Sequence, residues 1–247
     1  MAEYRVPPRQ SAPAVSPERR FNRGDAAAAG FYLLFVGVFS FLPITLPEQL
    51  AQDPLLAAYA VNVTFYLAAA VLAWLASRRA IAVELRLLAA RPVLTAAAIP
   101  GGVLLMLLVS MVAVVLAGPA EIPVNQQAAQ DLVTGLPPLL VIPMVVVLAP
   151  FVEEYVYRHL LIGKLSRYLN IWICAGLSVL LFAGIHVVGK QDFTAPVLAP
   201  YLAMGAVLVA VYIWAGKNFM LSYGVHAAKN LLAVLLTYAV PAELLQQ

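Results

Sequence analysis

The sequence predicts an all-α, polytopic membrane helix bundle, and three observations support this fold class. Hydrophobic residues make up 63% of the 247 residues and charged residues only 11%, far from the averages of soluble proteins. The apolar residues gather into segments of roughly 20 residues, the length that crosses a ~30 Å hydrocarbon core as a helix. Charged residues stand mostly between these segments, as expected for loops outside the bilayer.

Seven apolar segments are each long enough to span the bilayer as a helix, and proline or charge marks most of the breaks between them. A chain of this length leaves room for one membrane domain, at 26–247, without a second folded domain beside it. Residues 1–25 lack an apolar core and are rich in proline and arginine, so we expect a disordered cytosolic tail. The segments run approximately over 26–46, 55–76, 93–117, 138–163, 170–189, 196–215 and 219–240.

The distribution of basic residues predicts the topology. Loops rich in arginine and lysine stay in the cytosol, so the pattern predicts a cytosolic N-terminus and an external C-terminus. The net charge of +3 reflects this loop bias, and we expect the lipid bilayer and no nucleic acid as a partner. A single cysteine, Cys174, excludes an internal disulfide. The basic residues of the predicted cytosolic side are Arg5, Arg9, Arg19, Arg20, Arg23, Arg78, Arg79, Arg86, Arg91, Lys164, Arg167 and Lys217.

Two adjacent glutamates, Glu153 and Glu154, lie inside the fourth apolar segment, whereas the other ten acidic residues fall in tails or breaks. Carboxylates in the bilayer interior are costly, so the pair is a candidate functional site. Glu154 precedes Arg158 by four residues, the favourable order for a helical ion pair, and a buried ion pair with a structural role alone is the alternative interpretation. Adjacent residues point about 100° apart on a helix. We therefore expect Glu154 to hold Arg158 and Glu153 to face a cavity.

Polar residues of three segments are predicted to reach one depth. The fourth and fifth segments form a hairpin, and Glu153 and His186 each lie 16 residues from its turn. Counting ~1.5 Å per residue from the start of the seventh segment places His226 and Asn230 roughly 11–17 Å inside the bilayer. Phe182 and His186 are spaced i, i+4, as are His226 and Asn230, so each pair shares a helix face.

This set of residues can hydrolyse a peptide bond. Water between Glu153 and His186 can attack a carbonyl with the glutamate as general base. His226 and Asn230 can donate hydrogen bonds to the developing oxyanion, although Asn230 can also serve only to bond another helix. Other protease patterns fit less well, because there is no His-Glu-x-x-His, no Gly-x-Ser-x-Gly and no aspartate within an apolar segment. A zinc site of Glu153, His186 and His226 stays open, since two histidines and a glutamate are a known zinc set.

At these residues the sequence resembles the CAAX protease and bacteriocin-processing family, also called the Abi family, which includes type II CAAX prenyl endopeptidases. The resemblance covers residues 136–240 and implies an intramembrane endopeptidase. Its three motifs read here as Glu153-Glu154-Tyr155-Val156-Tyr157-Arg158, Phe182-Ala183-Gly184-Ile185-His186 and His226-Ala227-Ala228-Lys229-Asn230.

The resemblance also implies the roles of the motif residues. The first glutamate and the histidine of the second motif activate water, and the histidine and asparagine of the third motif form the oxyanion hole. The implied catalytic residues are Glu153, Glu154, His186, His226 and Asn230, with Arg158 and Phe182 as orienting residues. Family members are described both as metalloproteases and as metal-independent glutamate proteases. We expect the second type, with no metal and no cofactor.

The expected substrate is a membrane-associated protein or peptide, which in eukaryotic relatives is prenylated. The short chain and small loops are more similar to bacterial members, which are linked to peptide maturation and bacteriocin self-immunity, so a bacterial plasma membrane is expected. A non-catalytic scaffold that regulates a membrane partner is the main alternative. A transporter is the third, and the lack of an inverted repeat argues against it. Lys229, inside the third motif, has no assigned role.

Overall fold

The computed structural model describes residues 20–41, 52–118, 124–187 and 193–239, and within these ranges all regular structure is helical. Five of the described helices are long and apolar enough to cross a membrane, with a shorter apolar helix at Ile171–Val187, which confirms the predicted polytopic membrane bundle. Residues 1–19 of the expected tail lie outside the described residues. The five helices are Pro54–Ala89, Pro92–Ala117, Pro138–Arg167, Ala195–Trp214 and Phe219–Ala239.

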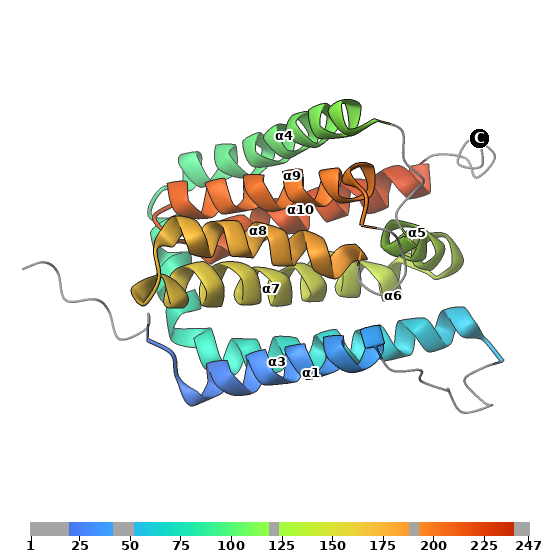
Figure 1. Ribbon diagram of the computed structural model, residues 1–247, viewed down its shortest axis with the longest axis horizontal. Helices are drawn as coiled ribbons and strands as arrows, with labels where there is room; N and C mark the ends of the chain where they lie inside the picture. Colours follow the sequence, from blue (N-terminus) through green and yellow to red (C-terminus); the bar gives the residue numbers. More distant parts are fainter. Residues whose placement is uncertain (1–19, 42–51, 119–123, 188–192, 240–247) are drawn as a thin grey trace, which may run out of the picture.

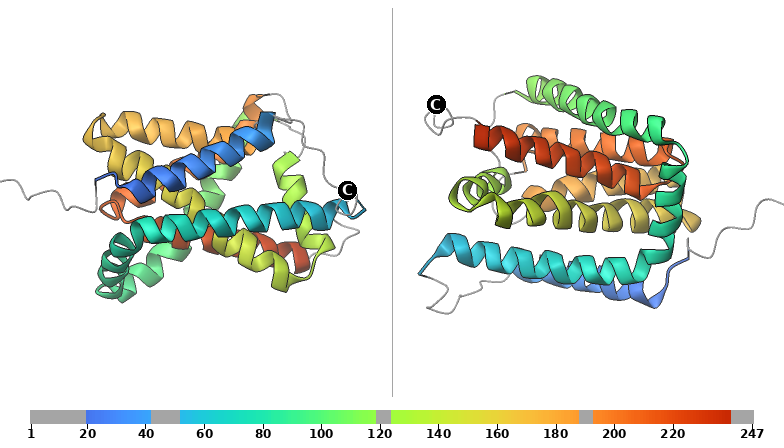
Figure 2. Two further views of the ribbon diagram at one scale, coloured as in Figure 1. Left: turned by 90° about the horizontal axis from the view of Figure 1, so that it is seen from below. Right: turned by 180° about the vertical axis from the view of Figure 1, so that it is seen from behind.

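The long helices lie side by side along a common direction (Figure 1). Helices α1 and α3 pack together on one side of the molecule and α4 lies on the opposite side, with the motif-bearing helices between them. The short helix α5 lies across one end of the bundle, and the last turns of α3 bend across the other end (Figure 2). The helices are α1 (Arg23–Phe41), α3 (Pro54–Ala89), α4 (Pro92–Ala117), α5 (Val124–Gly135), α8 (Ile171–Val187), α9 (Ala195–Trp214) and α10 (Phe219–Ala239).

The helix over Pro138–Arg167, which carries the two glutamates, changes its winding four times. α6 (Pro138–Ile142) leads into a π-helical segment, η2 (Pro143–Leu148), and α7 (Ala149–Glu154) into a second, η3 (Tyr155–Lys164), before a 3₁₀ turn, η4 (Leu165–Arg167). In η2 the amide of Ala149 donates to the carbonyl of Met144, five residues back. π-helical insertions often occur at functional sites, and here two of them flank the glutamates.

Three features of the fold differ from the sequence-based prediction. The second helix continues to Ala89, well past the expected residue 76. Helix α5 occupies the break between the third and fourth predicted spans, where no helix was expected. Helix α1 begins at Arg23, so Asp25 belongs to it rather than to a tail.

Asp25 is fully buried and connects α1 to the helix over Pro138–Arg167, named here the motif helix. Its carboxylate lies 2.6 Å from the amine of Lys164 and accepts a 2.7 Å hydrogen bond from the hydroxyl of Tyr155. The sequence-based reading placed Asp25 among the acidic residues outside the apolar segments. That expectation was wrong, because a carboxylate can be buried at a helix start when a cation and a hydroxyl from another helix satisfy it.

Candidate active site

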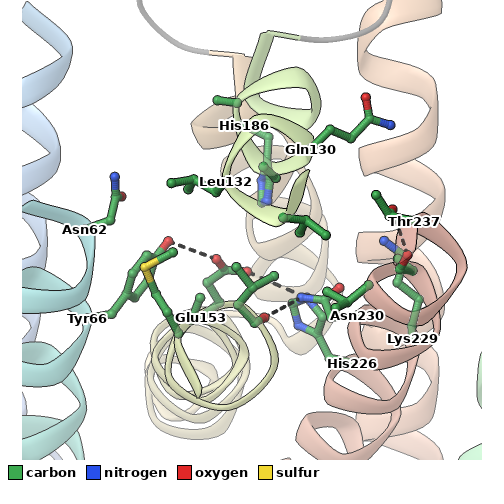
Figure 3. A pocket seen from close by; sticks show the side chains of 18 of the residues that line it. Asn62, Tyr66, Gln130, Leu132, Glu153, His186, His226, Lys229, Asn230 and Thr237 are labelled. Carbon is green, nitrogen blue, oxygen red and sulfur yellow. Dashed lines mark hydrogen bonds and ion pairs between the residues drawn. The ribbon is translucent and has the colours of Figure 1, made fainter. Parts of the chain in front are cut away.

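A pocket with a volume of about 320 Å³ lies among α3, α5, the motif helix, α8, α9 and α10. Four residues predicted from the motifs line it: Glu153, His186, His226 and Asn230. Figure 3 shows these side chains, from the helix over Pro138–Arg167, α8 and α10, converging on one space. The other polar residues of its lining are Asn62, Tyr66, Gln130, Tyr201, Lys229 and Thr237.

Glu154 and Arg158 lie behind this pocket and form the expected ion pair. A guanidinium nitrogen lies 3.1 Å from Glu154 Oε1, and both side chains are completely buried. Arg158 also donates to the carbonyl of Gly205 over 3.2 Å and stacks on the ring of Phe182, whose centroid is 4.6 Å away. A Cβ at Gly205 would lie 3.2 Å from the Phe182 ring, so glycine permits this close approach of α9. The pair therefore organises the contact between the motif helix, α8 and α9.

Glu153 faces the pocket, as its helix position predicts. Its side chain is largely buried, and the hydroxyl of Tyr66 on α3 donates to Oε1 over 3.3 Å. The Nε2 atom of His226 lies 3.8 Å from Oε2, beyond hydrogen-bond distance. One carboxylate oxygen is thus oriented by a tyrosine, and the other lies beside an imidazole.

His226 bridges the two glutamates, an arrangement that the sequence did not predict. Its Nδ1 lies 3.2 Å from Glu154 Oε1, while Nε2 faces Glu153. Because Glu154 is ion-paired with Arg158 and can only accept, Nδ1 carries a hydrogen. Nε2 can then donate a hydrogen bond only when the ring is protonated.

His186 lies at the end of α8 and is held in one orientation. Its Nδ1 lies 2.7 Å from the carbonyl of Phe182, and its ring stacks on Tyr201 with centroids 4.6 Å apart. A carbonyl can only accept, so Nδ1 carries the hydrogen. In the neutral ring Nε2 is therefore a hydrogen-bond acceptor, which is the form that can take a proton from water.

Asn230 makes a defined contact with the motif helix. Its side-chain nitrogen donates to the carbonyl of Val145 over 3.0 Å. The π-helical pattern of η2, in which Ala149 bonds Met144, would pair the carbonyl of Val145 with the amide of residue 150. Residue 150 is proline and has no N–H, so Asn230 supplies the missing donor. The amide has a second hydrogen, which is available for a ligand in the pocket.

Tyr66 and Asn62 also line the pocket, although neither was predicted from the sequence, where the second span is a generic apolar helix. The signal was present, because two polar residues spaced i, i+4 lie on one face of an apolar helix. Lys229 also lines the pocket, which gives the unassigned lysine of the third motif a location in the site.

The described residues do not form a geometry suited to binding a metal ion. No group of three histidine, cysteine, aspartate or glutamate side chains among them is arranged to hold a metal ion. The alternative zinc set of Glu153, His186 and His226 is accordingly not assembled as a ligand triad in this geometry. His226 instead directs one ring nitrogen to Glu154.

The fold and pocket define an integral membrane protein with a carboxylate and two histidines in a cavity between its helices. The family described as Type II CAAX prenyl endopeptidase Rce1-like matches residues 135–232, which include all three motifs. This match confirms the resemblance to the CAAX protease family, and the family implies a membrane-embedded protease. No curated protein and no solved structure matches the chain.

Proposed function

We propose that this protein is an intramembrane endopeptidase of the glutamate type, in which Glu153 activates the attacking water. One observation carries the proposal: Glu153 and His186 line the same pocket, and the bond from His186 Nδ1 to the Phe182 carbonyl leaves Nε2 as an acceptor. Two acceptors on one water molecule withdraw its protons and direct a lone pair at a bound carbonyl.

The reaction needs two proton transfers and no redox partner. Water adds to the peptide carbonyl carbon as Glu153 takes one proton, giving a tetrahedral intermediate with a negatively charged oxygen. Collapse of the intermediate breaks the C–N bond, and the proton held by Glu153 passes to the leaving amine. The products are a new carboxyl terminus and a new amino terminus. Tyr66 supports this cycle by holding one oxygen of Glu153 in place.

Two groups of the pocket are proposed to stabilise the oxyanion. The second amide hydrogen of Asn230 is one donor, and Nε2 of a protonated His226 is the other. Glu154 and Arg158 are positioning residues, because they orient His226 and do not line the pocket. Preorganised donors of this kind typically contribute about 10²–10³ in turnover each.

The substrate is proposed to be a membrane-associated protein or peptide. The pocket volume of about 320 Å³ falls at the lower end of the range of about 300–1,000 Å³ typical of small-molecule sites, so it accepts a short extended segment and no folded domain. A prenylated or otherwise lipid-anchored chain is the substrate class that the family match favours.

A comparison of membrane proteomes tests the proposal. Cells with the wild-type protein should contain at least one membrane peptide that is shorter than in cells with Glu153→Gln or His186→Asn. Asn at 186 can still donate to the Phe182 carbonyl while it removes the acceptor at Nε2. Asp53→Asn is the matched control, because it makes the same carboxylate-to-amide change at an exposed helix cap, where asparagine also caps well.

A scaffold would behave differently from an enzyme in this experiment. If the protein only binds and regulates a partner, Glu153→Gln should preserve the biological effect and no peptide should change in length. If Asp53→Asn produces the same change as Glu153→Gln, the effect does not depend on the pocket, and the proposed chemistry is wrong.

A further inference from the structure

Most of the residues that line the pocket lie in the half of the bundle nearer α5, named here the α5 end. Helices α3 and α9 begin at this end and contribute residues from their first halves, while α8 and α10 end there. The motif helix contributes residues only up to Glu153, its midpoint. Helix α5 completes the lining with Ala128, Ala129, Gln130, Leu132 and Val133. The pocket thus extends from Glu153 toward the α5 end.

The other half of the bundle is filled by side chains. Beyond Glu153 on the motif helix, Glu154, Tyr155, Arg158 and Lys164 are at most 1% exposed. A second, smaller pocket of about 110 Å³ near Lys164 shares no lining residue with the first. The buried side chains beyond Glu153 therefore separate the two pockets, and the pocket at Glu153 does not continue into the second one.

The opposite end, named here the arginine end, carries most of the basic residues in the described ranges. Apart from the buried Arg158, all arginines in the described ranges lie there: Arg20, Arg23, Arg78, Arg79, Arg86, Arg91 and Arg167. At the α5 end, the charged residues outside the pocket in the same ranges are Asp53 and Asp131. Short loops rich in arginine and lysine stay in the cytosol, so the arginine end is the cytosolic one.

We propose that the pocket opens on the non-cytosolic face of the membrane, and that its substrate is a short peptide segment exposed on that face. That the peptide segment in the pocket is a substrate, and is cleaved there, rests on the proposed function. The side of access rests on the pocket and the charge distribution alone. A segment that reaches Glu153 must enter extended past α5, so the chemical class is an unfolded tail or tether of a membrane-anchored chain, presented from outside the cytosol.

Cysteine accessibility in intact cells tests the side of access without requiring activity. The wild-type protein is the blank, because its single cysteine, Cys174, is fully buried. Thr237→Cys places a thiol in the pocket lining, and Gln52→Cys marks the exposed α5 end outside the pocket. Ala90→Cys marks the exposed turn between α3 and α4 at the arginine end and changes no charge. The probe is a membrane-impermeant maleimide, applied before and after permeabilisation.

Thr237→Cys and Gln52→Cys should react in intact cells, and Ala90→Cys only after permeabilisation. Reaction of Ala90→Cys in intact cells, without that of Gln52→Cys, would reverse the orientation and overturn the proposal. Reaction of Gln52→Cys without Thr237→Cys would show that the pocket does not open at the α5 end and would also overturn it. The expected labelling together with an unchanged proteome for Glu153→Gln would sustain the side of access and refute the proposed function.

Discussion

The side chain of Asn230 donates a 3.0 Å hydrogen bond to the carbonyl of Val145, in the place of the backbone N–H that Pro150 lacks. This contact joins the third motif to the π-helical turn that precedes the two glutamates. The asparagine therefore has a structural task that its position in the third motif does not reveal. A catalytic task can coexist with it, because the amide has two hydrogens.

The structural and catalytic roles of Asn230 can be separated by combining Asn230→Ala with Pro150→Ala. Asn230→Ala alone should lower the thermal midpoint, because it leaves the partly buried Val145 carbonyl without its donor, a loss of about 1 kcal/mol, at the lower end of the range for buried groups. Pro150→Ala restores a backbone N–H at this position, so Asn230→Ala should lower the midpoint less in that background. Loss of turnover by about 10²-fold should persist in both backgrounds if the second hydrogen serves the oxyanion.

If Asn230→Ala lowers the thermal midpoint equally in the two backgrounds, the Asn230 side chain does not take the place of the backbone N–H that Pro150 lacks. Normal turnover of the double variant would assign Asn230 to packing alone. Thermal midpoints in detergent and turnover of the same preparations provide both readouts.

The two adjacent glutamates should respond differently to the same change. Glu153→Gln should abolish turnover while the protein still inserts and purifies as a monodisperse species, because Glu153 faces the pocket. Glu154→Gln should reduce both yield and thermal midpoint, because it leaves the completely buried Arg158 without its counter-charge. Breaking one side of a buried ion pair typically costs about 3–5 kcal/mol. A Glu153→Gln protein with near-normal turnover would mean that another group is the base.

The hydroxyl of Tyr66 should affect turnover at Glu153 more strongly than it affects the stability of the fold. Tyr66→Phe removes the hydrogen bond to Glu153 Oε1, and a bond to a charged group contributes about 1.5–3 kcal/mol. We expect kcat to fall by roughly tenfold or more, with a fall in the thermal midpoint no larger than that of the control variant below. Tyr59→Phe is the matched control on the same helix, since it removes a hydroxyl that donates to the backbone of Leu140. Equal kinetic effects of the two variants would argue against a specific role for Tyr66.

Metal dependence is testable with the purified protein. The bridging position of His226 between two glutamates favours hydrogen bonding over ligation, so we expect turnover to persist in excess chelator and zinc to be substoichiometric. If chelation abolishes turnover and added zinc restores it, Glu153, His186 and His226 must be reassigned as ligands. Their reorganisation on metal binding would then be visible as a zinc-dependent rise of the thermal midpoint.

The helices and the convergence of the motifs follow from simple counting along the sequence. A span must be about 20 apolar residues long, and the hairpin returns His186 to the depth of Glu153, which is why both line one pocket. Helix α5 could not be predicted in this way, because Val124–Gly135 is too short and too polar to span a bilayer. Its position across the pocket depends on tertiary contacts with α3 and α10.

The arrangement of His226 could not be predicted for a different reason. The expectation for the glutamates used an ideal α-helix, in which neighbours point about 100° apart and contact different partners. Two π-helical segments flank Glu153 and Glu154, and one imidazole reaches both carboxylates. The i, i+4 spacing of Asn62 and Tyr66 did carry a usable signal, because polar residues on one face of an apolar helix indicate an interior surface.

The ion pair of Asp25 with Lys164 has a consequence for how the protein is made. The two residues are 139 positions apart, so a ribosome delivers the carboxylate to the membrane long before its lysine partner is synthesised. The Asp25 carboxylate of helix α1 therefore lacks its lysine partner until the motif helix is inserted. Truncated chains that end at Gly135 should be degraded faster in cells than chains that end at Arg167, in pulse–chase measurements. Equal lifetimes would indicate that helix α1 is stable without this late-arriving partner.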